Sequence, residues 1–145
     1  MQKGRSMVEM LGILVIIAVA TMGSIALWSQ MRTKMRITQT QNELSQISQD
    51  IAKLYSWTRD YSLLKMSQLC DAEIFPRGCN EGKTEGINPF GGAYKVDDVG
   101  RDSGGIPYFE LTVAGLPDED VCHEIMDVLQ EDYECDGNTL TVTFY

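Results

Sequence analysis

The hydrophobic pattern divides the chain into a long apolar run, an amphipathic stretch and a mixed C-terminal part. No charged residue occurs in the 22 residues from Met10 to Met31. A helix of that length extends about 33 Å, which is enough to cross the hydrocarbon core of a bilayer. Glu9 lies just inside the apolar boundary, after Met7 and Val8. A carboxylate at that depth is costly unless it is paired, so it is a candidate functional residue.

The stretch after the apolar run has a helical period. Between Ser29 and Ser56 there is neither Gly nor Pro, so no sequence signal ends the helix. Beyond Ile37, apolar residues recur every three or four positions, at Leu44, Ile47, Ile51 and Leu54. This spacing predicts an amphipathic helix with one buried stripe. We therefore expect one helix of about fifty residues, apolar over 5–31 and forming the spine of a globular head over 32–57.

Residues 58–145 predict a small head of helices and strands, so the expected fold class is α+β. The pattern predicts a short helix from Ser62, a loop-rich linker at 70–92, strands at 93–96 and 108–113, a helix from Pro117 to Leu129, and a last strand at 139–145. The Pro117 helix has an acidic first turn and one apolar face, formed by Val121, Cys122, Ile125, Val128 and Leu129. We expect the head to pack as an antiparallel sheet against the spine.

Four cysteines, Cys70, Cys79, Cys122 and Cys135, all follow the apolar run. An even count in a segment outside the cytoplasm indicates two disulfides. Three connectivities exist, and we favour Cys70–Cys79 with Cys122–Cys135, because each pair closes a short loop and the second links the Pro117 helix to the last strand. A zinc site is disfavoured, because no C-x-x-C occurs and His123 is the single histidine.

The charge of −9 is concentrated in the C-terminal part, where 11 carboxylates lie from Asp102 to Asp136 and no Lys or Arg follows Arg101. Such a surface repels phosphates, which argues against a nucleic-acid partner. The simplest interpretation is a solvated acidic surface. Loop carboxylates at Asp97, Asp98 and Asp102 are candidate calcium ligands, although they match no EF-hand loop.

No catalytic constellation is evident. His123 is alone, the serines lack a nucleophile-elbow pattern and the carboxylates show no spacing that selects an acid–base pair. We expect neither an enzyme nor a cofactor.

Three ordinary interpretations of the N-terminus fit less well. A cleaved secretory signal has a shorter apolar region followed by a small-residue cleavage site. A lipoprotein requires a cysteine near the apolar run, whereas the first is Cys70. A plain membrane anchor gives no reason for Glu9.

The N-terminal motif resembles the class III signal of type IV pilins and pseudopilins: a short basic leader ending at Gly4, four residues, Glu9, and then about twenty apolar residues. The resemblance implies that a prepilin peptidase cuts after Gly4, so 1–4 is the leader, Arg5 is the new N-terminus and Glu9 is the fifth mature residue. In a filament, the buried Glu9 neutralises the N-terminal ammonium of a neighbour and sets the register. The family N-methylates this terminus and usually has an apolar residue where this chain has Arg5.

The head resembles the type IVb branch at two places, Phe90-Gly91-Gly92 before the first strand and Gly115-Leu116-Pro117 before the cysteine-bearing helix. The resemblance implies a homopolymeric helical pilus subunit, made in the bacterial inner membrane, handled by the pilus assembly machinery and exported to the cell surface. A minor pilin or a type II secretion pseudopilin is the alternative within this class. A single-pass, membrane-anchored periplasmic binding domain is the alternative of another class.

The flanking charges disagree with this orientation. Arg32, Lys34 and Arg36 follow the apolar run, whereas only Lys3 and Arg5 precede it. The positive-inside rule alone therefore does not place the leader in the cytoplasm. The leader motif and the four cysteines favour that placement, and we adopt it. Within the run, Gly12, Thr21, Gly23 and Ser24 weaken the helix, and we expect the Gly23-Ser24 region to unwind in a filament.

Overall fold

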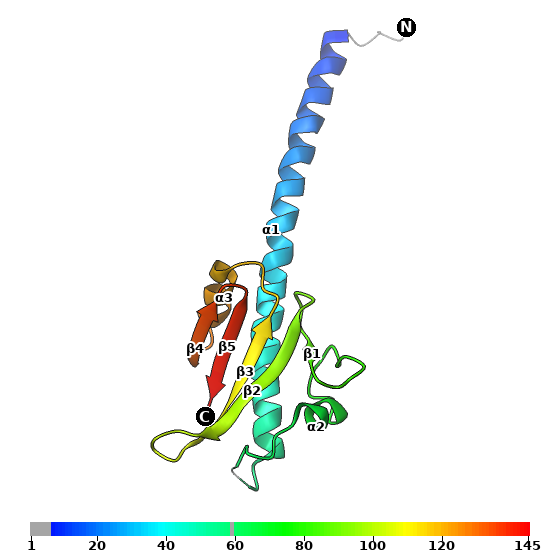
Figure 1. Ribbon diagram of the computed structural model, residues 1–145. Coiled ribbons are helices and arrows are strands. Elements are labelled where there is room, and N and C mark those ends of the chain that lie inside the picture. The colour runs from blue at the N-terminus through cyan, green and yellow to red at the C-terminus, as the bar shows by residue number, and fades with distance from the viewer. Residues whose placement is uncertain (1–6, 59) are drawn as a thin grey trace. The chain divides into compact units, whose positions relative to one another are not determined.

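The computed structural model describes residues 7–58 and 60–145, with the side chain of residue 26 excepted. Its elements in chain order are α1 (Met7–Leu54), α2 (Met66–Asp71), β1 (Gly86–Ile87), β2 (Ala93–Arg101), β3 (Pro107–Ala114), α3 (Glu119–Met126), β4 (Asp132–Asp136) and β5 (Thr139–Phe144) (Figure 1). The long helix combined with an antiparallel sheet confirms the expected α+β class.

The chain consists of two units, Met1–Met35 and Arg36–Tyr145, and α1 contributes to both. The unit boundary lies four residues after Met31, where the apolar run ends. The second unit, which we call the head, contains the C-terminal part of α1, the two short helices and the sheet.

The segment after α1 differs from the sequence expectation. The helix ends at Leu54 rather than residue 57, and α2 begins at Met66 rather than near Ser62. Turn hydrogen bonds from the Ser56 and Thr58 amides replace the helical pattern. The Asp60 carboxylate then accepts the Ser62 amide at 3.0 Å, an Asx turn that competes with helix formation.

The sheet is antiparallel throughout, with the strand order β1-β2-β3-β5-β4. The expected hairpin is formed by β2 and β3, with an irregular register between Val96 and Val99. Strand β4 was not predicted, and Cys135 lies in it. The Cys122–Cys135 disulfide therefore joins α3 to β4, and the expectation that it reaches the last strand is wrong.

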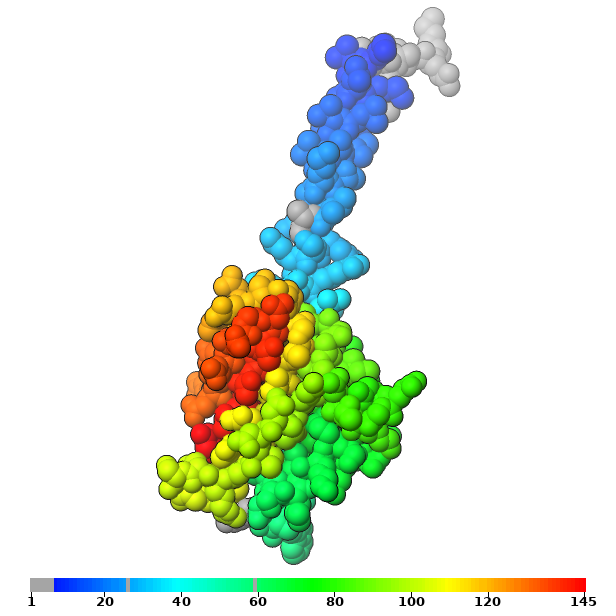
Figure 2. Space-filling model, viewed as in Figure 1, coloured from blue at the N-terminus to red at the C-terminus, as the bar shows by residue number. Residues whose placement is uncertain are grey.

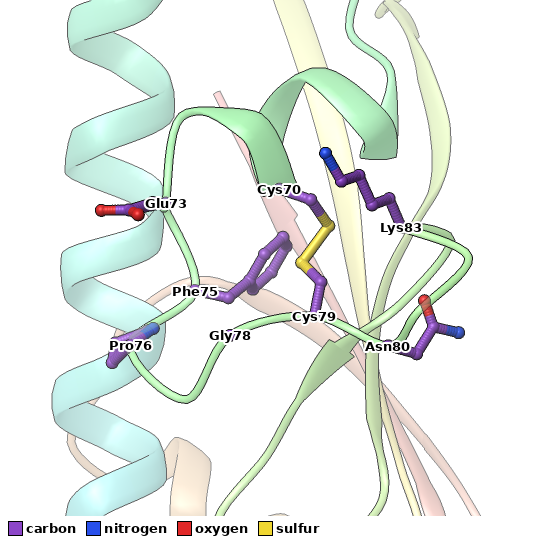
Figure 3. Close-up of a pocket in the computed structure, with 8 residues that line it drawn as sticks. All are labelled: Cys70, Glu73, Phe75, Pro76, Gly78, Cys79, Asn80 and Lys83. Carbon is purple, nitrogen blue, oxygen red and sulfur yellow. A yellow bond between two sulfur atoms is a disulfide. The ribbon is translucent and has the colours of Figure 1, made fainter.

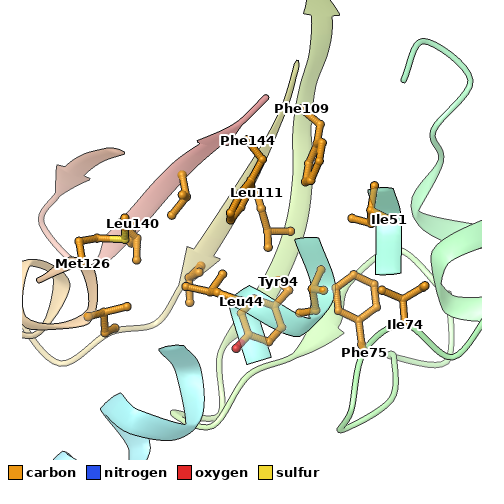
Figure 4. Close-up of a cluster of buried hydrophobic side chains, with 14 of the residues drawn as sticks. Leu44, Ile51, Ile74, Phe75, Tyr94, Phe109, Leu111, Met126, Leu140 and Phe144 are labelled. Carbon is orange, nitrogen blue, oxygen red and sulfur yellow. The ribbon is translucent and has the colours of Figure 1, made fainter. Parts of the chain in front are cut away.

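The core lies between the sheet and the C-terminal part of α1 (Figure 4). Alternate residues of β3 and β5 are buried toward α1: Phe109, Leu111, Val113, Leu140, Val142 and Phe144. Ile37, Leu44, Ile47 and Ile51 complete the core from the helix. The buried Phe109 ring stacks on Phe144 with centroids 5.2 Å apart. Burying these side chains supplies most of the stabilisation of the head.

Two residues that were expected on buried faces are exposed. Leu54 is the last residue of α1 and is 51% exposed, because the chain leaves the helix there. Val128 is 69% exposed, because α3 ends at Met126 and no longer holds Val128 on its apolar face. Asp118 caps that helix by accepting the Val121 amide at 2.9 Å, so α3 begins close to the expected Pro117.

The turn before β2 depends on a close backbone approach. The buried Asn88 side chain donates to the Ala114 carbonyl at 2.7 Å and accepts the Gly92 amide at 2.9 Å. A Cβ atom on Gly92 would overlap the Ala114 carbonyl oxygen, so only glycine fits this position. The Gly-Gly pair therefore allows the start of β2 to pass against the end of β3.

Candidate functional site

The first candidate surface is the exposed, apolar N-terminal part of α1. Its large apolar side chains from Met7 to Met31 are all exposed within the described residues. α1 is the one described helix that is long and apolar enough to span a membrane, with a window of mean hydropathy 2.5 and none of that window buried within the chain. Exposed apolar patches on soluble monomers are rarely this large and mark surfaces that another molecule covers. This segment is the candidate site, and we call it the apolar segment.

Glu9 lies in the first turn of α1 and is exposed. A carboxylate there interacts favourably with the helix dipole, but it still requires a cation once lipid or protein covers the surface. The predicted processing residues Gly4 and Arg5, of which Arg5 is also an assembly residue, lie outside the described residues. The proposed pairing of Glu9 therefore stays a prediction.

The middle of the apolar segment has a face of small residues. A shallow groove there is lined by Ile17, Ala20, Thr21, Ser24 and Ile25. The Ser24 hydroxyl donates to the Ala20 carbonyl at 2.8 Å, and Thr21 bonds back to Ile17 and Ala18 in the same way. Their hydroxyls are thereby satisfied within the helix, which suits close packing against another helix in an apolar medium.

An aromatic residue and a cation meet at the C-terminal end of the apolar segment. The Arg32 guanidinium lies 5.8 Å from the centre of the Trp28 ring. The two residues are one helical turn apart, and both are exposed. The sequence pattern identified Arg32 as a charge that flanks the apolar run, but it identified neither Trp28 nor the contact between the two residues.

In the head, the loop after α2 is shaped by the Cys70–Cys79 disulfide (Figure 3). A cavity of about 450 Å³ beside it is lined by Cys70, Glu73, Phe75, Pro76, Gly78, Cys79, Asn80 and Lys83. The ammonium of Lys83, one of these residues, pairs with the Asp71 carboxylate. Glu73 has a positive φ of 53°, because the Ile74 and Glu73 amides close a Schellman motif onto Leu69 and Cys70 at the end of α2.

The same loop is attached to α1 through a carboxylate, Glu43, next to the apolar stripe of the spine. Glu43 is buried: one oxygen accepts from Arg77 Nε at 3.1 Å, and the other accepts from the Tyr94 hydroxyl at 3.0 Å. A second nitrogen of Arg77 donates to Gln39 at 3.0 Å. Burial, with the Glu43 carboxylate beside it, raises the pKa of Tyr94, so the phenol stays protonated and donates.

The second disulfide, Cys122–Cys135, lies beside His123. The His123 Nδ1 atom is 3.3 Å from the Tyr133 hydroxyl, and its Nε2 atom is 3.9 Å from Glu119. Both cysteines are oxidised, so these neighbours include no thiolate nucleophile. The two disulfides join the pairs that loop length favours.

The strands of the sheet lie in front of α1 in Figure 2, so that view faces the outer side of the sheet. Acidic residues of β2, β3 and β4 are exposed or partly exposed. Burial, together with nearby Asp98, Asp97 and Glu134, raises the pKa of Glu110. On the same face, a hydrogen bond and ion pair with Glu85 raise the pKa of Lys95. Repulsion among the carboxylates indicates a surface that is stabilised when protons or cations approach.

The candidate calcium ligands do not converge. Asp102 accepts the Gly104 and Ile106 amides and shapes the β2–β3 turn, whereas Asp98 accepts the Tyr108 hydroxyl at 2.8 Å. Among the residues described, no group of three His, Cys, Asp or Glu side chains is arranged to hold a metal ion.

Comparison with known proteins places most of the head in one family. A family model described as PilS N terminal matches residues 34–143. The match covers the spine part of α1 and extends into β5, and it begins after the apolar segment. No curated protein matches the sequence.

Proposed function

We propose that the chain is a structural subunit of a type IV pilus-like filament. The family match covers more than half of the chain, so the chain belongs to the PilS N-terminal family of type IV pilin-like proteins. This family is a pilin-related structural family rather than an enzyme family. In this proposal the chain is made as a prepilin, cut after Gly4 and held in the inner membrane by the apolar segment. The assembly machinery then transfers it into a helical filament outside the cell.

The exposed apolar segment is the observation that carries the proposal. It is long enough to cross a bilayer, and its small-residue face suits packing against other helices. Lipid covers it in the subunit pool, and copies of the same helix cover it in the filament. A head with its own buried core and two disulfides remains folded through this transfer.

Glu9 then has a defined partner. Cleavage after Gly4 leaves an ammonium at Arg5, four residues before Glu9. When helices bundle, the Glu9 carboxylate of one subunit pairs with this ammonium of a neighbour, because a buried carboxylate without a cation is strongly destabilising. This pairing fixes the axial register of successive subunits.

The first experiment measures the intact mass of the chain from membranes, with and without a co-expressed prepilin peptidase. We expect the peptidase to remove Met1 to Gly4. Replacement Gly4→Leu blocks the cut, whereas the matched control Gly12→Leu is still processed because it lies outside the motif. A chain that stays uncut in the membrane contradicts the proposal and favours a membrane-anchored binding domain instead.

A second experiment tests assembly separately from processing. We expect Glu9→Gln to be processed normally and to give no sheared filaments, whereas Glu119→Gln, which removes an exposed head carboxylate, assembles like the parent. Normal filaments from Glu9→Gln contradict the role of Glu9. Processed chain that joins filaments only as a trace component indicates a minor pilin or a pseudopilin.

A further inference from the structure

The exit of the apolar segment combines an aromatic ring with cations. Arg32 lies over the Trp28 ring at 5.8 Å, and Lys34 follows two residues later. All three side chains are exposed. At about 100° per residue, Lys34 points about 200° around the helix from Arg32, so the two cations lie on different sides of α1.

Arg32 has no carboxylate within helical reach on its own element. The nearest ones on α1 are Glu9 and Glu43, and Glu43 is 11 residues away. Ion pairs along a helix form between residues three or four apart, so α1 itself offers Arg32 none. The Arg32 guanidinium contacts the Trp28 ring, which orients it and leaves its N–H donors accessible.

We propose that Trp28, Arg32 and Lys34 form a binding site for the phosphate groups of anionic phospholipids, which we call the headgroup collar. The inference rests on the proposed membrane-anchored state of the subunit. The 22-residue apolar run ends at Met31, so the collar lies where hydrocarbon gives way to headgroups. Tryptophan favours that level of the bilayer, and long cationic side chains extend from it toward the phosphates.

The two cations have different roles in this site. The planar Arg32 guanidinium donates two parallel hydrogen bonds to one phosphate, while its other face remains against Trp28. Lys34 acts as a point charge toward a second lipid on the other side of the helix. The acidic head of another copy, which carries a net charge of −12 over 36–145, is the competing partner. The position directly after the apolar run, together with the tryptophan, favours lipid.

The test first establishes insertion. The full chain with Trp57→Phe, which leaves Trp28 as the single tryptophan, is reconstituted in phosphatidylcholine vesicles containing brominated lipids. Quenching of Trp28 fluorescence shows that the segment is in the bilayer. Absence of quenching contradicts the proposed function itself as well as the collar.

Lipid selectivity is then measured by native mass spectrometry of the full chain in mixed micelles of phosphatidylglycerol and phosphatidylcholine. We expect a preference for phosphatidylglycerol of about fivefold for each of the two cations at low salt, decreasing as salt is raised. The double variant Arg32→Gln, Lys34→Gln loses the preference. The matched double variant Lys65→Gln, Lys83→Gln, which removes two exposed head cations, keeps it. Arg32→Lys retains part of the preference, because the charge remains although lysine cannot donate two parallel hydrogen bonds to one phosphate.

Three results overturn the collar while leaving the proposed function intact. The first is an inserted chain that binds both lipids equally, or whose preference survives the collar variant. The second is a collar variant with unchanged lipid selectivity that fails to assemble filaments, which assigns the cations to a neighbouring acidic head. Inorganic phosphate is the control ligand, compared with chloride at the same ionic strength. A site that loses phosphatidylglycerol to phosphate but not to chloride binds free phosphate as well as lipid, and this also contradicts the collar.

Discussion

Replacing Arg77 by Met will destabilise the head through the carboxylate that it leaves behind. Arg77 is half exposed, but its partner Glu43 lies in the core with a side chain only 12% exposed. After the replacement, Glu43 keeps the Tyr94 hydroxyl and loses its single cationic donor among the described contacts. The loop that carries Arg77 also loses its hydrogen bond to Gln39 on α1.

The expected cost follows from this geometry. Breaking a buried ion pair on one side costs about 3–5 kcal/mol. Because the Arg77 side chain is 39% exposed, solvent screens part of that interaction, and we expect about 2 kcal/mol for Arg77→Met. Glu43→Met removes the buried charge and leaves the Tyr94 hydroxyl unpaired, at about 1–3 kcal/mol. The double variant will cost less than the sum, because the charge left unpaired by Arg77→Met is no longer present.

The assay is urea unfolding of the full, oxidised chain in detergent micelles, followed by near-ultraviolet circular dichroism of the buried tyrosines. Lys53→Met is the matched control, because it breaks an ion pair to Asp50 whose lysine is 73% exposed. We expect less than about 0.5 kcal/mol from that change. If Arg77→Met costs no more than Lys53→Met, or if the double-variant cycle shows no coupling, the reasoning about Glu43 is wrong.

Three further predictions concern the head and use the same unfolding assay. Gly92→Ala forces a Cβ into the Ala114 carbonyl and will cost at least about 3 kcal/mol. The control Gly82→Ala, whose Cβ meets only ordinary contacts, will change stability by less than about 0.5 kcal/mol. Equal effects of the two changes refute the close approach. Glu73→Gly relieves a left-handed residue at the end of α2 and will stabilise by about 0.5–1 kcal/mol, and any loss contradicts this. Glu110→Gln will stabilise the head at neutral pH, because the raised folded-state pKa of Glu110 means that its ionised carboxylate destabilises the fold. This gain will shrink as pH falls through the raised pKa and will vanish below the unfolded value of about 4.3. A gain that does not depend on pH refutes this reasoning.

The long helix and the first hairpin could be predicted from the sequence, because few residue types produce the patterns that indicate them. A charge-free run followed by apolar residues every three or four positions predicts α1, and the glycine pairs predict the β2–β3 hairpin. The Cys122–Cys135 pair was also expected from loop length, but the strand that carries Cys135 was not. The reason is β4: its sequence, Asp132-Tyr133-Glu134-Cys135-Asp136, alternates acidic residues and carries weak strand propensity.

Strand β4 exists because β5 pairs with it over its whole length and because α3 is attached to it through the disulfide. Such support comes from segments that a local pattern does not include. The burial of Glu43 was missed for the same reason. A glutamate on the border of an apolar stripe is ordinarily solvated, and its cation, Arg77, lies 34 residues further along the chain. The apolar segment needed no such partner to be recognised, because its composition alone identifies it.

The placement of the disulfides decides how the chain carries mechanical load. Both lie beyond α1, close loops of 9 and 13 residues, and no cysteine precedes Cys70. A tensile force applied to α1 therefore meets no covalent cross-link to the sheet. It is transmitted through the packing of Leu44, Ile47 and Ile51 and through the Glu43–Arg77 contact. Under a pull along the helix the spine will shear from the sheet before either cross-linked loop opens, so the rupture force of the head is set by non-covalent packing.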